Sequence, residues 1–135
     1  MDTLCDYGDV VAEVVSELAF KISNARQAGI CDVIVDPGFG FAKTTEQNMK
    51  LLARLDWLRV LDCPVLTGVS RKRMTREAAG CGSEEALTPT IALNAVALLN
   101  GADIIRVHDA TAGVLTARVI ETLRAAANSH TSQQK

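Results

Sequence analysis

Several features that mark other classes of protein are scarce in this sequence. Aromatic residues make up only 4% of the 135 residues, so a hydrophobic core must be built mainly from Leu, Val, Ile and Ala. Basic residues are not in excess: 14 Lys and Arg stand against 16 Asp and Glu, which gives a formal net charge of −2. This balance argues against a nucleic-acid partner or an anionic membrane partner, since either would need a clear basic excess.

Long apolar runs and export signals are also absent. No apolar run approaches the roughly 20 residues that a membrane-spanning helix needs. The N-terminal segment is acidic, with Asp2, Asp6 and Asp9, and is therefore unlike a secretory signal or a transit peptide. The four cysteines are widely spaced and form no C-x-x-C pair, which makes a zinc or redox motif weak. We therefore expect reduced thiols in a cytoplasmic protein.

Helical and strand-like patterns alternate along the sequence. Apolar residues spaced by three and four predict helices, and short apolar runs between turn signals predict buried strands. The predicted helices cover residues 8–28, 44–58, 73–79, 88–99 and 111–127. The predicted strands cover residues 33–35, 64–68 and 102–105. We expect a T-x-x-Q capping box at Thr44 and Gln47, and a later helix that begins with Thr88 as N-cap and Pro89 as its first residue.

The alternation of helices and strands is typical of an α/β fold, in which helices connect parallel strands. Three strands cannot close a (β/α)8 TIM barrel, which needs eight strands and about 250 residues. The chain is therefore either a small open sheet or a partial (β/α)8 TIM barrel with three parallel strands and flanking helices. We expect residues 1–128 to form this domain and the polar residues 129–135 to be a disordered tail.

A different polar cluster follows each predicted strand. Residues 36–43 contain one carboxylate, two glycines and a lysine, residues 70–73 read Ser-Arg-Lys-Arg, and residues 106–109 read Arg-Val-His-Asp. Barrel enzymes place their functional groups at the carboxyl ends of the strands. This set of groups suits a planar, hydrogen-bonding substrate that also carries an anion.

The first cluster has two interpretations. Asp36 can accept two parallel hydrogen bonds from an amino-substituted heterocycle, or it can cap the turn that follows it. Gly40 allows a ligand to approach the backbone closely or allows a positive φ. The rings of Phe39 and Phe41 lie on either side of Gly40, so one can face a flat ligand and the other the core.

The second cluster has the composition of an anion site. Cations and amide N–H groups at a strand-to-helix turn, as at Ser70, Arg71 and Lys72, can bind an anion. The alternative is a solvated run of charges, which is the interpretation that we favour for Arg73 and Arg76. The position of Lys72 next to a strand end favours a functional role for this residue.

The third cluster combines an arginine and a histidine. Arg106 and His108 are two residues apart at the end of a predicted strand, and side chains two apart on a strand share a face. Together they suit a phosphate or a pyrophosphate. The alternative is an Arg106 that is paired with a neighbouring acid such as Asp109. A single His-x-Asp sequence is a weak signal for a metal or a catalytic dyad, so we predict no metal ligand among these residues.

Taken together, the motifs D-P-G-F-G-F-x-K-T, G-x-S-R-K and R-V-H-D resemble those of the dihydropteroate synthases, in this order and at this spacing. The resemblance extends from about Tyr7 to Ala127. It implies a TIM barrel in which the three motifs follow the sixth, seventh and eighth strands. It also implies the family reaction, in which p-aminobenzoate condenses with 6-hydroxymethyl-7,8-dihydropterin pyrophosphate and pyrophosphate is released.

The resemblance gives each matching residue an expected role. Asp36 would bind the pterin ring, Lys72 would contact its polar edge, and Gly40 and Phe41 would lie beside the pterin and the aminobenzoate. Arg106 and His108 would hold the pyrophosphate leaving group. The expected catalytic residues, which also bind substrate, are Lys72, Arg106 and His108.

Two further basic residues belong to the expected substrate-binding set together with Ser70. Arg71 would help to shape the anion site. Arg73 stands where many family members have a Ser that receives the aminobenzoate carboxylate, and its guanidinium offers another way to bind that group.

The resemblance also identifies what this sequence does not contain. Counterparts of the family's first five strands are missing, and with them the Asn that binds Mg²⁺ together with the pyrophosphate. We therefore expect a fragment that is inactive alone, and either a homodimer or a complementing N-terminal half as its partner. Two alternatives are a non-catalytic pterin-binding or interaction module and the pterin domain of a methyltetrahydrofolate-dependent methyltransferase. The S-R-K and R-V-H-D motifs favour the synthase, because methyl transfer has no anionic leaving group.

Overall fold

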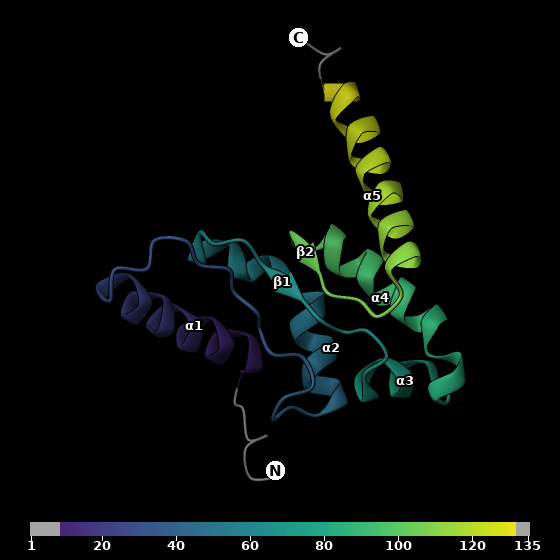
Figure 1. The fold of residues 1–135 in the computed structure, drawn as a ribbon, viewed down its shortest axis with the longest axis horizontal. Helices are drawn as coiled ribbons and strands as arrows, with labels where there is room; N and C mark the ends of the chain where they lie inside the picture. The colour runs from purple at the N-terminus through teal and green to yellow at the C-terminus, as the bar shows by residue number, and fades with distance from the viewer. Residues whose placement is uncertain (1–8, 132–135) are drawn as a thin grey trace.

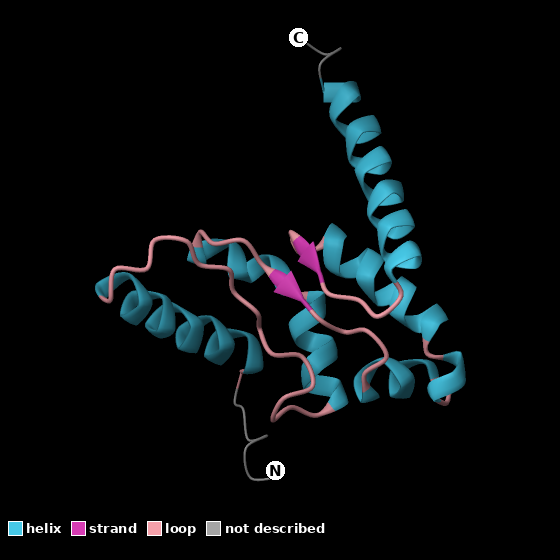
Figure 2. Cartoon of the chain, in the orientation of Figure 1, coloured by secondary structure: helices cyan, strands magenta, loops and turns pink. Residues whose placement is uncertain are grey.

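The computed structural model describes residues 9–131, in which helices flank two short strands (Figure 1). The strands lie in the middle of the chain's fold, and helix α5 extends away from the other elements (Figure 2). No helix within residues 9–131 is long and apolar enough to cross a membrane. The elements in chain order are α1 (Val10–Gln27), α2 (Thr45–Ala53), η2 (Leu55–Leu61), β1 (Leu66–Thr67), α3 (Arg73–Ala79), η3 (Ser83–Glu85), α4 (Leu87–Leu99), β2 (Ile104–Ile105) and α5 (Ala110–Thr131).

The first two α-helices confirm the predicted pattern. Asp9 caps α1, because its Oδ1 accepts hydrogen bonds from the backbone N–H groups of Val11 and Ala12 at 3.1 and 3.2 Å. The capping box at Thr44 and Gln47 is present at the start of α2. The predicted helix over residues 44–58 is divided, because α2 ends at Ala53 and the chain continues as the 3₁₀ helix η2.

The sheet is smaller than the sequence predicts. Strands β1 and β2 are parallel, with Leu66 opposite Ile104 and Thr67 opposite Ile105. The first of the predicted strands, residues 33–35, is reduced to one parallel bridge between Val35 and Val65. A prediction of three strands is therefore not confirmed. Within residues 9–131, the backbone hydrogen bonds of this segment are those of Val35 alone, whose N–H donates to the carbonyl oxygen of Pro64 at 2.9 Å and whose carbonyl oxygen accepts the N–H of Leu66 at 2.8 Å.

The start of α4 differs from the prediction. The helix begins at Leu87, directly after η3, so Thr88 is not its N-cap. The backbone N–H of Thr90 donates to the carbonyl oxygen of Ala86 at 3.1 Å, which makes Ala86 the cap. Pro89 then lies in the first turn, where a missing N–H costs no helical hydrogen bond. At the other end of the chain, α5 continues to Thr131, four residues beyond the prediction, and 132–135 lie outside the described residues.

The core joins the helices to the strands and to the loop after the first of the predicted strands. Its fully buried members include Phe39 from that loop, Val69 from the segment after β1, and Leu51, Leu55 and Leu58 from α2 and η2. This packing fixes the segments that follow Val35 and β1. As the strands are parallel, the segments at their carboxyl ends meet at one edge of the sheet.

Candidate functional site

The loop that follows Val35 is held by its own side chains and by α2. The Asp36 Oδ1 accepts the backbone N–H of Gly38 at 2.9 Å, and the Asn48 Oδ1 accepts that of Gly40 at 3.0 Å. The Lys43 Nζ donates to the carbonyl oxygens of Gly38 and Phe41 at 2.9 and 3.1 Å. Gly40 has a φ of +84°, a conformation that glycine adopts without strain. Asp36 therefore has the turn-capping role of one prediction and keeps its second oxygen for another group.

That second oxygen meets the arginine of the third cluster. The Arg106 Nη1 lies 3.2 Å from the Asp36 Oδ2, although the two residues are 70 positions apart in the sequence. The guanidinium also passes directly over Gly68, where a Cβ atom would collide with it. Arg106 thus has an acidic partner, as one alternative expected, but that partner is Asp36 rather than Asp109.

Lys72 links the first and second clusters. Its Nζ donates to the carbonyl oxygen of Phe39 at 2.6 Å and lies 5.2 Å from the centre of the Phe41 ring. Burial lowers the pKa of the Lys72 ammonium group, and the positive charge of Arg106 lowers it further, whereas the Asp36 carboxylate opposes both. Phe39 is fully buried, and Phe41 is 64% exposed beside the ammonium group. One ring therefore belongs to the core and the other remains open to a ligand.

Ser70 and His108 form a second junction between the strand ends. The Ser70 Oγ lies 2.8 Å from the His108 Nδ1 and also accepts the backbone N–H of His108 at 3.2 Å. A cavity of about 110 Å³ opens beside them, and its lining consists of Gly68, Ser70, Lys72, Arg106, Val107 and His108. Cationic and hydrogen-bonding groups from the second and third clusters therefore surround one small space.

The remaining basic residues of the second cluster point to other partners. The Arg71 guanidinium forms two hydrogen bonds with the Asp109 carboxylate, at 2.9 and 3.0 Å, and does not line the cavity. The Arg73 Nε lies 2.6 Å from the Glu77 Oε1 on the same helix, and its side chain is 82% exposed. The hydroxyl group of Thr45 also donates to Glu77. Arg71 and Arg73 are therefore next to site residues in the sequence, but their charged groups pair with acids outside the cavity.

Three residues that matter to this geometry have no role in the predicted site. Asn48 is 2% exposed on α2 and holds Gly40, and Asp109 holds Arg71. Thr90, also 2% exposed, accepts the backbone N–H of Arg71 at 3.0 Å. A buried polar residue in an apolar helical stripe is the sequence signal that could have identified Asn48 and Thr90.

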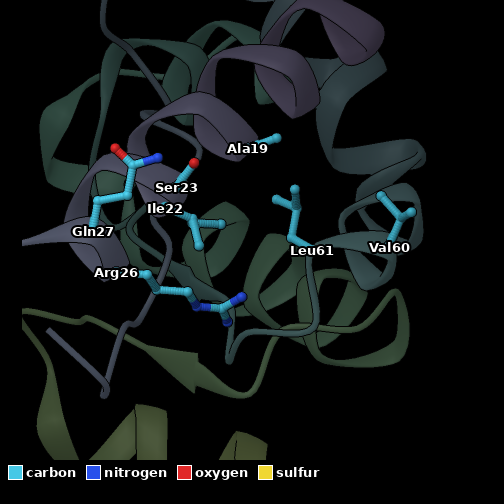
Figure 3. A pocket seen from close by; sticks show the side chains of 7 residues that line it. All are labelled: Ala19, Ile22, Ser23, Arg26, Gln27, Val60 and Leu61. Carbon is cyan, nitrogen blue, oxygen red and sulfur yellow. The ribbon is translucent and has the colours of Figure 1, made fainter. Parts of the chain in front are cut away.

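A larger hollow lies elsewhere on the molecule. It has a volume of about 500 Å³ and lies between α1 and η2, with Ile22 and Arg26 on one side and Val60 and Leu61 on the other (Figure 3). None of its lining residues belongs to the three clusters. Arg26 is the one charged residue among the described residues that line it, whereas the smaller cavity at the strand ends joins Lys72, Arg106 and His108, so we assign the candidate site to the smaller cavity.

The acidic residues of the site do not form a metal centre. Within residues 9–131, no group of three or more His, Cys, Asp and Glu side chains is arranged to hold a metal ion. Asp36 is paired with Arg106 and Asp109 with Arg71. The described residues alone therefore do not fit a magnesium ion.

The Arg71–Asp109 pair predicts a pH-dependent contribution to stability. Hydrogen bonding to Arg71 holds the pKa of the Asp109 carboxyl below its ordinary value, so this contribution is complete above the ordinary value. It disappears as the pH falls through the lower pKa of the folded state. We expect Asp109→Asn to lower the melting temperature at neutral pH, and we expect the difference from wild type to shrink in acid.

Thermal unfolding between pH 7 and pH 2 measures this dependence. Asp32→Asn is the matched control, because Asp32 is exposed and forms none of the ion pairs found within residues 9–131. A difference between Asp109→Asn and wild type that stays constant across the range would contradict the predicted role of the ion pair.

Parallel strands flanked by helices, with cationic and hydrogen-bonding groups at the strands' carboxyl ends, are typical of a segment of a (β/α) barrel. Residues 1–108 match the family model described as "Pterin binding enzyme", so the chain belongs to this family. The chain is 42% identical to a dihydropteroate synthase from Escherichia coli K12 over 125 residues, which are 90% of this chain and 44% of the relative. It is 38% identical to a dihydropteroate synthase from Synechocystis, with coverage of 91% and 44%.

Solved structures give the same result. The dihydropteroate synthase from Xanthomonas albilineans in complex with 7,8-dihydropteroate superposes with a TM-score of 0.87 at 41% identity, over 90% of this chain and 49% of that one. The enzyme from Thermus thermophilus in complex with 4-aminobenzoate gives a TM-score of 0.85 at 40% identity, over 89% and 49%. The chain thus has the fold of part of a TIM barrel and spans about half the length of the proteins it matches.

Proposed function

We propose that this chain provides the pterin and pyrophosphate sites of a dihydropteroate synthase in folate biosynthesis. The reaction condenses p-aminobenzoate with 6-hydroxymethyl-7,8-dihydropterin pyrophosphate. The observation that carries the proposal is the cavity that joins Lys72, Arg106 and His108 beside the Asp36 carboxylate. Relatives that share this fold were solved with 7,8-dihydropteroate, with 4-aminobenzoate and with 6HMPPP, which supports these substrates.

The geometry suggests how each group would contribute. The Asp36 carboxylate would accept hydrogen bonds from the pterin, which would compete with its present ion pair to Arg106. The amine of p-aminobenzoate forms a C–N bond to the methylene carbon as the C–O bond to pyrophosphate breaks, and the amine loses a proton. Arg106 and His108 would stabilise the negative charge that develops on the departing pyrophosphate. Lys72, between Phe39 and Phe41, would contact the polar edge of the pterin.

The complete enzyme would need more than this chain. We propose that an N-terminal half supplies the remaining strands, or that the chain forms a homodimer. The exposed apolar side chains on α5 support a protein partner, since each is at least half exposed: Val114, Leu115, Val119 and Leu123.

Magnesium remains a prediction for the complete barrel, since the described residues do not make a site for it. The described cysteines, Cys31, Cys63 and Cys81, form no disulfide. We propose a cytoplasmic location, where thiols are kept reduced.

A non-catalytic pterin-binding module is the second candidate function. The observation that favours it is that the candidate pterin and anion groups, Asp36, Lys72 and Arg106, all lie together on this segment. Such a module would bind a pterin and form no dihydropteroate in any combination with an N-terminal half. The methyltransferase alternative has less support, because the cavity at Arg106 and His108 suits an anion that methyl transfer does not release.

We expect Arg106→Ala and His108→Ala to weaken the binding of pyrophosphate more than the binding of 6-hydroxymethyl-7,8-dihydropterin, which has no phosphate. Each loses a hydrogen bond to a charged group, which is worth about 1.5–3 kcal/mol. Isothermal titration calorimetry with both ligands measures the two losses, and the affinity for pyrophosphate should also fall with salt. Arg59→Ala is a control, because Arg59 lies on η2 and does not line the cavity. Equal losses of affinity for both ligands would show that these residues do not belong to the anion site.

A further inference from the structure

The turn that follows β1 has an unusual backbone. Arg71 has a φ of +57°, in the left-handed region that a residue with a side chain rarely adopts. Its neighbours Ser70 and Lys72 line the cavity, whereas the Arg71 side chain points to Asp109. Arg71, the left-handed residue, therefore lies between two residues whose side chains line the cavity, while its own side chain points elsewhere. A strained conformation of this kind persists only where surrounding contacts impose it.

Two threonine hydroxyl groups make such contacts, one from each neighbouring helix. The Thr90 Oγ1, on α4, accepts the backbone N–H of Arg71 at 3.0 Å and donates to the carbonyl oxygen of Ala86 at 2.6 Å. The Thr75 Oγ1, on α3, donates to the carbonyl oxygen of Val69 at 2.6 Å. Both threonines are buried, with exposures of 2% and 0%. The turn, which the Lys72 N–H closes by donating to the carbonyl oxygen of Val69 at 3.3 Å, is thus also held at Val69 and at Arg71 by side chains outside the cavity.

We propose that Thr90 and Thr75 are positioning residues, whose hydroxyl groups hold the turn at Arg71 and thereby direct Ser70 to His108 and Lys72 into the anion cavity. The inference rests on the proposed function of that cavity. Without the Thr90 hydroxyl, the Arg71 N–H loses its acceptor, and the turn can relax toward a negative φ. Such a change would rotate the peptide planes on both sides and separate the Ser70 Oγ from the His108 ring.

The chain offers a matched control in the same region. Thr116 on α5 is 8% exposed and donates to the carbonyl oxygen of Ala112, in its own helix, at 2.7 Å. Thr90 and Thr116 line the same small space between α4 and α5. The substitution Thr116→Val therefore removes a buried hydroxyl from the same packing environment without touching the turn. Thr90→Ser keeps the hydroxyl group and removes only a methyl group.

The test compares Thr90→Val, Thr90→Ser, Thr75→Val and Thr116→Val in the 135-residue chain. The first readout is the ¹⁵N chemical shift of the His108 Nδ1 at fixed pH, which reports its contact with Ser70. The second is the affinity for inorganic pyrophosphate by calorimetry. For Thr90→Val and Thr75→Val we expect a changed ring shift and a loss of affinity of about tenfold. For Thr90→Ser and Thr116→Val we expect values close to wild type.

Each outcome supports or overturns the positioning role. An unchanged ring shift in folded Thr90→Val and Thr75→Val would overturn it, and so would an equal change in Thr116→Val. If Thr90→Val does not fold, Thr75→Val against Thr116→Val makes the same comparison from the α3 side. A wild-type chain that binds no pyrophosphate would contradict the proposed function, while the ring shift would still decide the role of the threonines.

Discussion

Asp36→Ala and Lys72→Ala are each expected to weaken pterin binding by roughly tenfold to a hundredfold in a complete barrel that contains this chain. Asp36 offers a carboxylate at the end of the strand segment, and Lys72 offers an ammonium group 2.6 Å from the carbonyl oxygen of Phe39. The loss of one hydrogen bond to a charged group costs about 1.5–3 kcal/mol, which is roughly a tenfold to hundredfold loss of affinity. Asp36→Ala also leaves Arg106 without its ion-pair partner, so its effect should extend to the anion cavity.

Calorimetry with 6-hydroxymethyl-7,8-dihydropterin checks this expectation. Lys50→Ala is a suitable control for the loss of a lysine, because Lys50 is paired with Glu46 on the exposed face of α2 and does not line the cavity. Asp32→Ala serves the same purpose for the loss of an aspartate. Unchanged affinity in both Asp36→Ala and Lys72→Ala would show that the site has been assigned to the wrong residues.

The parts of the fold that depend on local sequence could be predicted. The capping box of α2 needs only Thr44 and Gln47, and it is present. The strand at residues 33–35 could not be predicted in the same way, since a ladder depends on partners far away in the sequence. The predicted start of α4 is wrong because the 3₁₀ turn η3 leads directly into the helix. The first carbonyl group that accepts a hydrogen bond of the helix is therefore that of Ala86 rather than that of Thr88.

The same distinction applies to the site. The sequence indicates which strand ends carry polar groups, because each cluster follows an apolar run. It does not indicate which charges pair, since the Asp36–Arg106 and Arg71–Asp109 pairs join residues that are 70 and 38 positions apart. Asp103 and Asp109 each lie three residues from Arg106 in the sequence, but the guanidinium that pairs with Asp109 is that of Arg71, a residue with a left-handed backbone.

The 135-residue chain alone is expected to form no dihydropteroate at a useful rate. Within the described residues, the sheet consists of β1, β2 and a bridge at Val35, whereas a closed TIM barrel needs eight strands. Ile34 and Ile104 are 56% and 37% exposed along the outer sides of this small sheet. Exposed apolar strand edges favour pairing with other strands and aggregation. The Arg106 side chain is 57% exposed, so water would not be excluded from the reacting groups.

A complementation assay tests this expectation directly. The purified chain is assayed for dihydropteroate with magnesium, p-aminobenzoate and 6-hydroxymethyl-7,8-dihydropterin pyrophosphate, and then again after addition of the N-terminal half of a relative such as the E. coli synthase. We expect activity only in the second assay, because added strands would pair with the open edges and cover the site. A mixture of the N-terminal half and the Arg106→Ala variant of this chain controls for activity that does not use this cavity. Full activity from the 135 residues alone would refute the requirement for a second half, and binding without turnover in both assays would favour the non-catalytic pterin-binding module.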